Sequence, residues 1–213
     1  MLIHLLRITV FLLLVSVSNA SHSSEQLLNR FFQEVDSLQA SFEQTVVDES
    51  GMTLEQSSGL FYLSRPGKFR WNYNDPYSDN DESGQQIIAD GKSIYMYDPD
   101  LEQVTQRSMF DALSQVPSLL LVQSGGQIRD HFHITDFGVT DGLSWVSLKP
   151  KAEDASYQKL MIGFAGSELR SIVLLDGLGN ETRLKLLRVE NNANISSSLF
   201  DFNVPEGTDV LVQ

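Results

Sequence analysis

The chain has 213 residues, and its 28 Asp and Glu against 15 Lys and Arg give a formal net charge of −13. This charge repels a phosphate backbone, so we expect no nucleic-acid partner. The chain has no cysteine, which excludes disulfides, thiolate metal sites, a cysteine nucleophile and lipid attachment through cysteine. Apolar residues make up 41%, enough for the core of one domain.

Residues 1–20 have the pattern of a cleaved signal peptide. Arg7 precedes an apolar run over residues 8–17, and Ala20 ends a stretch of small residues at the expected cleavage site. A membrane anchor is the alternative, but this run is about half of the roughly 20 residues that a spanning helix needs. We therefore expect residues 21–213 to form one exported, soluble domain.

The mature chain begins with a predicted amphipathic helix. Ser23 and Gln26 stand at capping-box spacing. The residues at helical spacing behind them are apolar: Leu27, Leu28, Phe31, Phe32, Val35 and Leu38.

Most of the remaining chain has strand character. Residues 68–74 alternate, with Phe69, Trp71 and Tyr73 on one face, and Asp90-Gly91 indicates a tight hairpin. The predicted strands are 40–48, 54–64, 68–74, 86–89, 92–97, 128–137, 143–149, 157–164, 168–176, 181–190 and 199–204. Residues 109–123 instead predict two short helices with a kink at Pro117. The predicted fold is mainly β with some α: an open, incomplete antiparallel β-barrel covered by a lid of about three short α-helices.

Several motifs together resemble the LolA family of outer-membrane lipoprotein carriers, and the likeness covers nearly all of the mature chain. In chain order they are residues 40–44 (ASFEQ), 63–71 (LSRPGKFRW), 90–92 (DGK), 95–98 (YMYD), 101–105 (LEQVT), the kinked segment 116–122 and 200–205 (FDFNVP). The acidic loop 75–85 is longer than the family pattern, and its role stays open.

The resemblance implies a half-closed barrel with a three-helix lid and no enzymatic activity. It implies a periplasmic chaperone that binds the acyl chains of lipoproteins released by the inner-membrane transporter LolCDE. It further implies transfer of this cargo to the outer-membrane receptor LolB. We expect a monomer without a cofactor.

Arg65 is the most informative residue, because its strand position places it on the same face as Phe61 and Leu63. A guanidinium in such an apolar setting needs acceptors, and the last carbonyls of a short helix are unpaired. We expect Arg65 to bond carbonyls of residues 117–123 and to latch the lid, the role that the resemblance implies for this arginine. Alternatively its side chain extends outward to solvent or to a surface carboxylate.

The apolar residues around Arg65 are the predicted cargo site. Phe61, Leu63, Phe69 and Trp71 are the candidates for the cavity and for handover, and we expect Phe69 to be exposed near the barrel mouth. The predicted lid lining is Leu27, Phe31, Leu119, Leu120 and Leu121. Permanent packing of helices on a sheet would use the same residues.

Other chemistry has little support in the sequence. His131 and His133 share a strand face but lack a third ligand, and an EF-hand match over residues 79–90 is loose because Asp90 replaces the usual Glu. Nothing singles out a catalytic pair or a nucleophile elbow, so we expect no enzyme. A lipid-sensing module of the same fold and a carrier of another amphiphile remain the alternatives.

Overall fold

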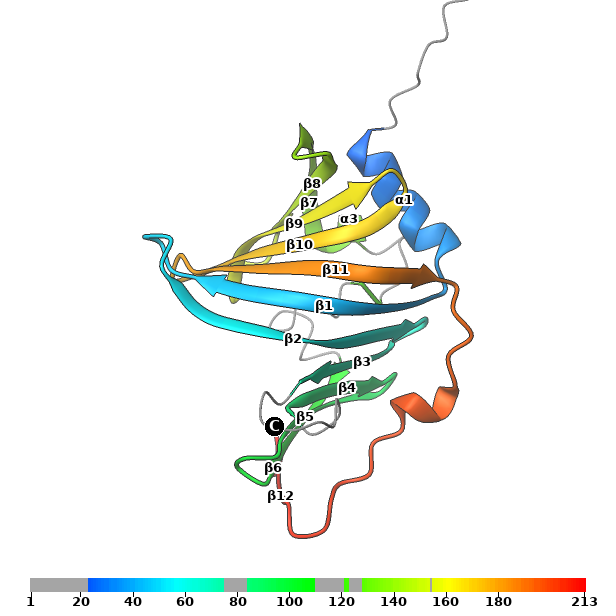
Figure 1. Cartoon of the computed structure of the whole chain (residues 1–213), viewed down its shortest axis with the longest axis vertical. Coiled ribbons are helices and arrows are strands. Elements are labelled where there is room, and N and C mark those ends of the chain that lie inside the picture. Colours follow the sequence, from blue (N-terminus) through cyan, green and yellow to red (C-terminus); the bar gives the residue numbers. More distant parts are fainter. Residues whose placement is uncertain (1–22, 75–83, 110–120, 123–127, 154) are drawn as a thin grey trace, which may run out of the picture.

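The computed structural model describes residues 23–74, 84–109, 121–122, 128–153 and 155–213. Its centre is one sheet with the strand order β12-β6-β5-β4-β3-β2-β1-β11-β10-β9-β8-β7, so β12 and β7 are its two edges and the sheet is open (Figure 1). The strands are β1 (Ser37–Val47), β2 (Thr53–Ser64), β3 (Lys68–Tyr73), β4 (Gln86–Asp90), β5 (Ser93–Asp98), β6 (Gln103–Ser108), β7 (Phe132–Thr140), β8 (Leu143–Pro150), β9 (Tyr157–Ala165), β10 (Glu168–Asp176), β11 (Glu181–Asn191) and β12 (Asp209–Val212).

The predicted first helix is confirmed. Helix α1 (Ser24–Glu34) begins after Ser23, whose Oγ accepts a hydrogen bond from the Gln26 backbone N–H at 3.3 Å. Its apolar side packs against β7, β8 and β9. The other described helices are α3 (Ile128–His131) and the 3₁₀ turn η3 (Ser197–Phe200).

The expected lid of about three helices is not confirmed. Of the two helices predicted over 109–123, residues 110–120 and 123 lie outside the described residues. Residues Leu121 and Val122 are described, and both are buried.

The face of the sheet that carries the core is here called the inner face. Alternate residues of the central strands point to it, among them Phe42 on β1, Phe61 on β2 and Trp71 on β3. These side chains form one buried cluster with Leu28 and Phe31 of α1. Burial of this cluster fixes the register of the strands, because a one-residue slip would turn the apolar set outward.

The outer face is more covered than the sequence indicates. Residues 192–208 run from the end of β11 past the strand ends to β12 (Figure 1). Arg70 donates to the Leu199 carbonyl at 3.2 Å, and Asn72 is fully buried on this face. The ring of Phe202 lies 5.3 Å from that of Tyr95. The alternating pattern of β3 therefore predicted which residues lie on each face of the strand. It did not predict that the outer face, with Arg70 and Asn72, is covered.

Three details of the predicted strand pattern are wrong. Residues 199–204 form no strand, because Phe200 and Phe202 pack on the outer face instead of pairing. Residues 128–131 form α3 before β7 begins. Strands β6 and β12 were not predicted, and their pairing is parallel in a sheet that is otherwise antiparallel.

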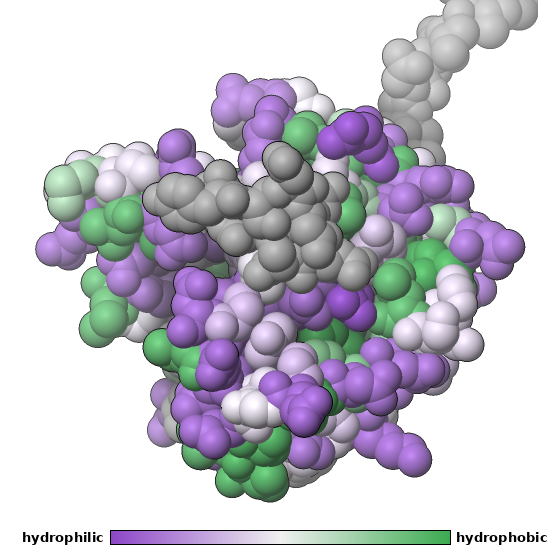
Figure 2. Space-filling model, turned by 60° about the horizontal axis from the view of Figure 1, so that its bottom comes forward, coloured by the Kyte–Doolittle hydropathy of each residue, from purple (hydrophilic) through white to green (hydrophobic). Residues whose placement is uncertain are grey.

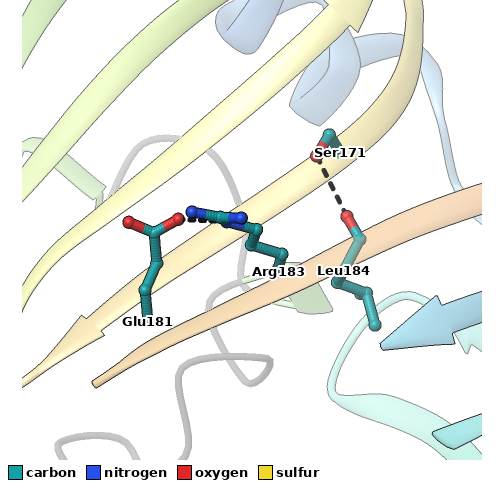
Figure 3. A network of polar contacts seen from close by, with 4 residues as sticks. All are labelled: Ser171, Glu181, Arg183 and Leu184. Atoms are coloured by element: carbon teal, nitrogen blue, oxygen red, sulfur yellow. Dashed lines mark hydrogen bonds and ion pairs between the residues drawn. The ribbon is translucent and has the colours of Figure 1, made fainter. Parts of the chain in front are cut away.

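The outer side of β10 and β11 carries polar groups. Figure 3 shows the Ser171 hydroxyl donating to the Leu184 carbonyl, and the Arg183 guanidinium paired with Glu181. Much of the surface in Figure 2 is hydrophilic, with apolar area at the projecting end on the left, where the β1–β2 and β10–β11 turns lie in Figure 1. The exposed apolar side chains of these turns are Met52, Leu54 and Leu178.

Gly59 on β2 makes room for the aromatic part of the core. A Cβ atom built there would lie 1.9 Å from the Asn72 carbonyl oxygen and 2.8 Å from the Phe42 ring. The missing side chain lets Phe42 of β1 reach across β2 to Trp71 and Tyr73 of β3, at ring distances of 5.0 and 5.4 Å.

We expect Gly59→Ala to lower the free energy of unfolding by about 1–3 kcal/mol, because the added methyl group overpacks this contact. Urea denaturation measures the change. Gly177→Ala is the matched control, since the nearest atom to its added Cβ is 3.8 Å away. Equal stability of the two variants would contradict the packing argument.

Candidate functional site

Arg65, directly after β2, joins three segments that are distant in the sequence. Its Nε and Nη2 atoms donate to the Leu121 carbonyl at 3.2 and 2.9 Å, and Nη1 donates to the Phe31 carbonyl at 3.4 Å. The Arg65 backbone N–H donates to the Asp36 carbonyl at 2.8 Å. The fork geometry of a guanidinium allows these simultaneous bonds, which one ammonium group cannot reproduce.

Aromatic rings surround the same guanidinium. Its central carbon lies 4.8 Å from the centre of the Phe31 ring and 5.0 Å from that of Phe32. Burial lowers the pKa of Arg65 to about 10, although the negative charge of Asp36 acts against this shift. The group therefore stays charged at neutral pH in a largely apolar environment, and carbonyl oxygens solvate it.

Gly67 adds a second link between the β2–β3 turn and the segment at 121–122. Its backbone N–H donates to the Val122 carbonyl at 3.2 Å. The expected contact of Arg65 with a carbonyl of residues 117–123 is thus present at Leu121, and its role as a latch stays a prediction. Sequence reasoning did not predict that Phe31 and Phe32 contact Arg65. The only hint in the sequence was that two aromatic residues are adjacent in the predicted helix.

Both ends of α1 are attached to the sheet. At its start, the Ser24 backbone N–H donates to Asp136 Oδ2 on β7 at 3.0 Å. Hydrogen bonds from the backbone N–H groups of Gly138 and Ser24 hold the pKa of Asp136 below its usual range. At the other end, the Asn192 amide donates to the Glu34 carbonyl at 2.9 Å. This helix is fixed to the barrel independently of Arg65.

The structure brings most of the predicted site residues into one buried cluster. The predicted site residues that belong to this cluster are Leu27, Phe31, Phe61, Leu63, Phe69, Trp71 and Leu121. Phe69 is completely buried, so the expectation of an exposed aromatic at the barrel mouth is wrong. The sheet places Phe69 between Leu63 and Ala89, and its neighbours cover it. Leu119 and Leu120 lie outside the described residues.

Metal binding receives no support from the described part of the chain. No group of three or more His, Cys, Asp or Glu in it is arranged to hold an ion. His131 and His133 are both exposed, and most of the acidic loop 75–85 is outside the described ranges. Within those ranges, no helix has the length and apolar character needed to cross a membrane.

Comparison with known proteins places this architecture in a family. The profile of the outer membrane lipoprotein carrier protein LolA matches residues 33–203. The chain belongs to the LolA family. A relative from Methylobacillus flagellatus, named outer-membrane lipoprotein carrier protein, is 39% identical over 184 residues, which cover 86% of each chain. Another of that name, from Methylococcus capsulatus, is 38% identical and covers 91% of this chain and 89% of its own.

Solved structures with low sequence identity share the LolA-type fold. An uncharacterized conserved protein from Thermus thermophilus has a TM-score of 0.54 at 14% identity, covering 89% of this chain and 99% of its own. A putative outer membrane lipoprotein-sorting protein domain from Vibrio parahaemolyticus has a TM-score of 0.51 at 10% identity, covering 83% and 94%. Family membership makes this chain a carrier protein, not an enzyme.

The buried Tyr157 and the partly buried Tyr73 predict a loss of stability in alkali. Burial raises the pKa of Tyr73 to about 12 and that of Tyr157 to about 12. Above pH 10 the unfolded chain loses protons that the folded chain keeps, so the free energy of unfolding falls up to about pH 12. Arg65 acts in the opposite sense there, because its pKa is lowered on folding.

Denaturant unfolding at successive pH values measures this effect. We expect Tyr73→Phe and Tyr157→Phe each to remove part of the alkaline loss. An alkaline slope that is unchanged in both variants would contradict the assignment.

Proposed function

We propose that this protein is a periplasmic chaperone that accepts acylated lipoproteins from LolCDE and delivers them to LolB. The proposal rests on an open sheet with an apolar inner face. Over this face, Arg65 donates hydrogen bonds to the carbonyl groups of both Phe31 and Leu121. The names of the relatives support the cargo class. The motifs shared with the LolA family support the two partners.

The energetics of the cargo explain why such a carrier is needed. A lipid anchor with about forty methylene groups gains roughly 30 kcal/mol on leaving water. Non-covalent complexes saturate near roughly −20 kcal/mol, and a carrier must also release its cargo. The anchor must therefore be shielded, but by a surface that covers it imperfectly.

The inner face offers the apolar but incompletely covering surface that such a carrier needs. Beyond the fully buried cluster, several apolar side chains on it are only partly buried. They include Ile87 on β4, and Ile172 and Leu174 on β10. We infer that acyl chains bind along these residues when the segment at 121–122 moves away.

Arg65 is the proposed latch of the cargo-free state. Because α1 is attached at Asp136 and Asn192, the movable partner is the segment that contains Leu121. In the empty protein this segment covers the inner face and Arg65 holds it there. Loading breaks the two bonds to the Leu121 carbonyl, and release restores them, which favours handover to the receptor.

We expect Arg65→Leu to bind lipoprotein but to retain it. Loss of the charge-assisted bonds destabilises the closed, empty state by about 2 kcal/mol, which is about a 30-fold shift toward the loaded state. Transfer of a purified complex to LolB measures this shift. The control is Arg188→Leu, which removes an exposed arginine of β11. Normal transfer by Arg65→Leu would refute the latch.

The function itself is tested with the mature protein and spheroplasts that contain lipoproteins in the inner membrane. We expect a soluble 1:1 complex with lipoprotein in the medium, formed only with active LolCDE, and its transfer to membranes only with LolB. A sensing module would bind lipid without releasing lipoprotein from the spheroplasts, and that result would overturn the proposal.

A further inference from the structure

Four residues with polar side-chain groups form a strip on the mainly apolar inner face. Gln44 on β1 pairs with Ser57 on β2, while Tyr73 and Trp71 on β3 pair with Gly59 and Phe61 of β2. The even positions of β1 and the odd positions of β2 and β3 share this face with the buried core. These four residues, Gln44, Ser57, Trp71 and Tyr73, are here called the polar strip.

Ring contacts hold the members of the strip together. The Phe42 ring lies 5.0 Å from that of Trp71 and 5.4 Å from that of Tyr73, and the last two are stacked at 6.3 Å with an interplanar angle of 24°. The Tyr73 hydroxyl donates to Gln44 Oε1 at 3.4 Å, close to the upper limit for a hydrogen bond. Trp71, Tyr73 and Gln44 are therefore connected through side chains, and Ser57 lies opposite Gln44 on the neighbouring strand.

Two donors of the polar strip lack an acceptor among the described residues. Trp71 is 6% exposed, and neither its Nε1 atom nor the Ser57 Oγ atom has a hydrogen-bond partner in the described part of the chain, although both atoms are buried. Such groups cost free energy, and each calls for an explanation. The other tryptophan of the chain shows the ordinary arrangement, with Trp145 Nε1 donating to the Thr140 carbonyl at 3.2 Å.

The surroundings define what kind of acceptor fits the two donors. None of the four strip residues is charged, and the nearby Glu55 carboxylate contributes to the raised pKa of Tyr73. A bound carboxylate or phosphate would meet this negative charge without a counter-charge from the strip. Partly buried Ile87, directly beside Trp71 on β4, favours an apolar ligand. A neutral carbonyl oxygen attached to an alkyl chain meets all of these conditions.

We propose that Trp71 Nε1–H and the Ser57 hydroxyl donate hydrogen bonds to ester carbonyl oxygens of the cargo's lipid anchor. The inference rests on the proposed carrier function and adds a polar recognition site to it. Ester carbonyls lie where the acyl chains meet the glyceryl group, so these bonds fix how deeply the anchor enters. The donors are left unpaired by an ether-linked analogue, which therefore binds more weakly.

Tryptophan labelling tests this with the unaltered mature protein. The chain has two tryptophans, so ¹⁵N-labelled tryptophan gives two indole N–H signals. A synthetic diacyl lipopeptide should shift the Trp71 signal downfield and bind about a hundredfold more tightly than the dialkyl ether analogue of equal chain length, about tenfold for each of the two hydrogen bonds. The ether analogue should leave the Trp71 signal without this shift, and the Trp145 signal should stay unchanged with both ligands.

Variants separate hydrogen bonding from packing. Trp71→Phe should lower affinity for the ester about tenfold and reduce the preference over the ether by the same factor, and Ser57→Ala should reduce that preference further when the two changes are combined. Trp145→Phe is the matched control and should keep the preference, because its indole N–H already has an acceptor. Equal weakening of both ligands by Trp71→Phe, together with no downfield shift, would overturn the proposal.

Three further outcomes are decisive. If a fatty-acid carboxylate of equal chain length shifts the Trp71 signal as strongly as the ester does, the preference for a neutral carbonyl is refuted. If wild-type protein binds neither lipopeptide, the carrier function fails and this inference fails with it. Binding of both lipopeptides with equal affinity leaves the carrier function intact and overturns only the role of the polar strip.

Discussion

The arrangement of the candidate site depends on the solvation of one permanent charge. The guanidinium of Arg65 lies against two aromatic rings, and the carbonyls of Phe31 and Leu121 replace water around it. A buried cation without such acceptors is costly. The end of α1, the β2–β3 turn and the segment at 121–122 must therefore meet at this point. Because the same bonds are local and few, they can be exchanged for contacts with a ligand.

The open sheet supplies the rest of the mechanism. The sheet has two open edges, at β7 and β12, so other segments must cover its inner face. Helix α1 covers the β7–β9 side and is attached at both ends. On β4 and β10, Ile87, Ile172 and Leu174 on this face are only partly buried. A surface of this kind gains free energy from a ligand without holding it irreversibly.

The inner face carries two polar features with opposite consequences. Arg65 has its acceptors in the structure, and under the proposed latch its bonds stabilise the cargo-free state. Trp71 Nε1 and Ser57 Oγ lack acceptors among the residues that the structure describes, and under the proposed recognition a ligand that supplies carbonyl oxygens stabilises the loaded state. The balance between these two sets of hydrogen bonds tunes a carrier toward reversible binding, because the apolar contribution from the acyl chains is large and nonspecific.

The sequence by itself determined the features that depend on residues adjacent in the chain. The cap at Ser23, the alternation of β3, the Asp90-Gly91 turn and the need of Arg65 for carbonyl acceptors all follow from local geometry and from the chemistry of single side chains. Only the tertiary structure decided which distant segments meet. It buried Phe69 between neighbouring strands, covered Asn72 with residues near the C-terminus and paired β12 with β6. The tertiary structure also placed Ser57 opposite Gln44 and let the Phe42 ring reach past Gly59 to β3. The register between strands is set by packing between distant residues, and hydrophobic periodicity in the sequence does not encode it.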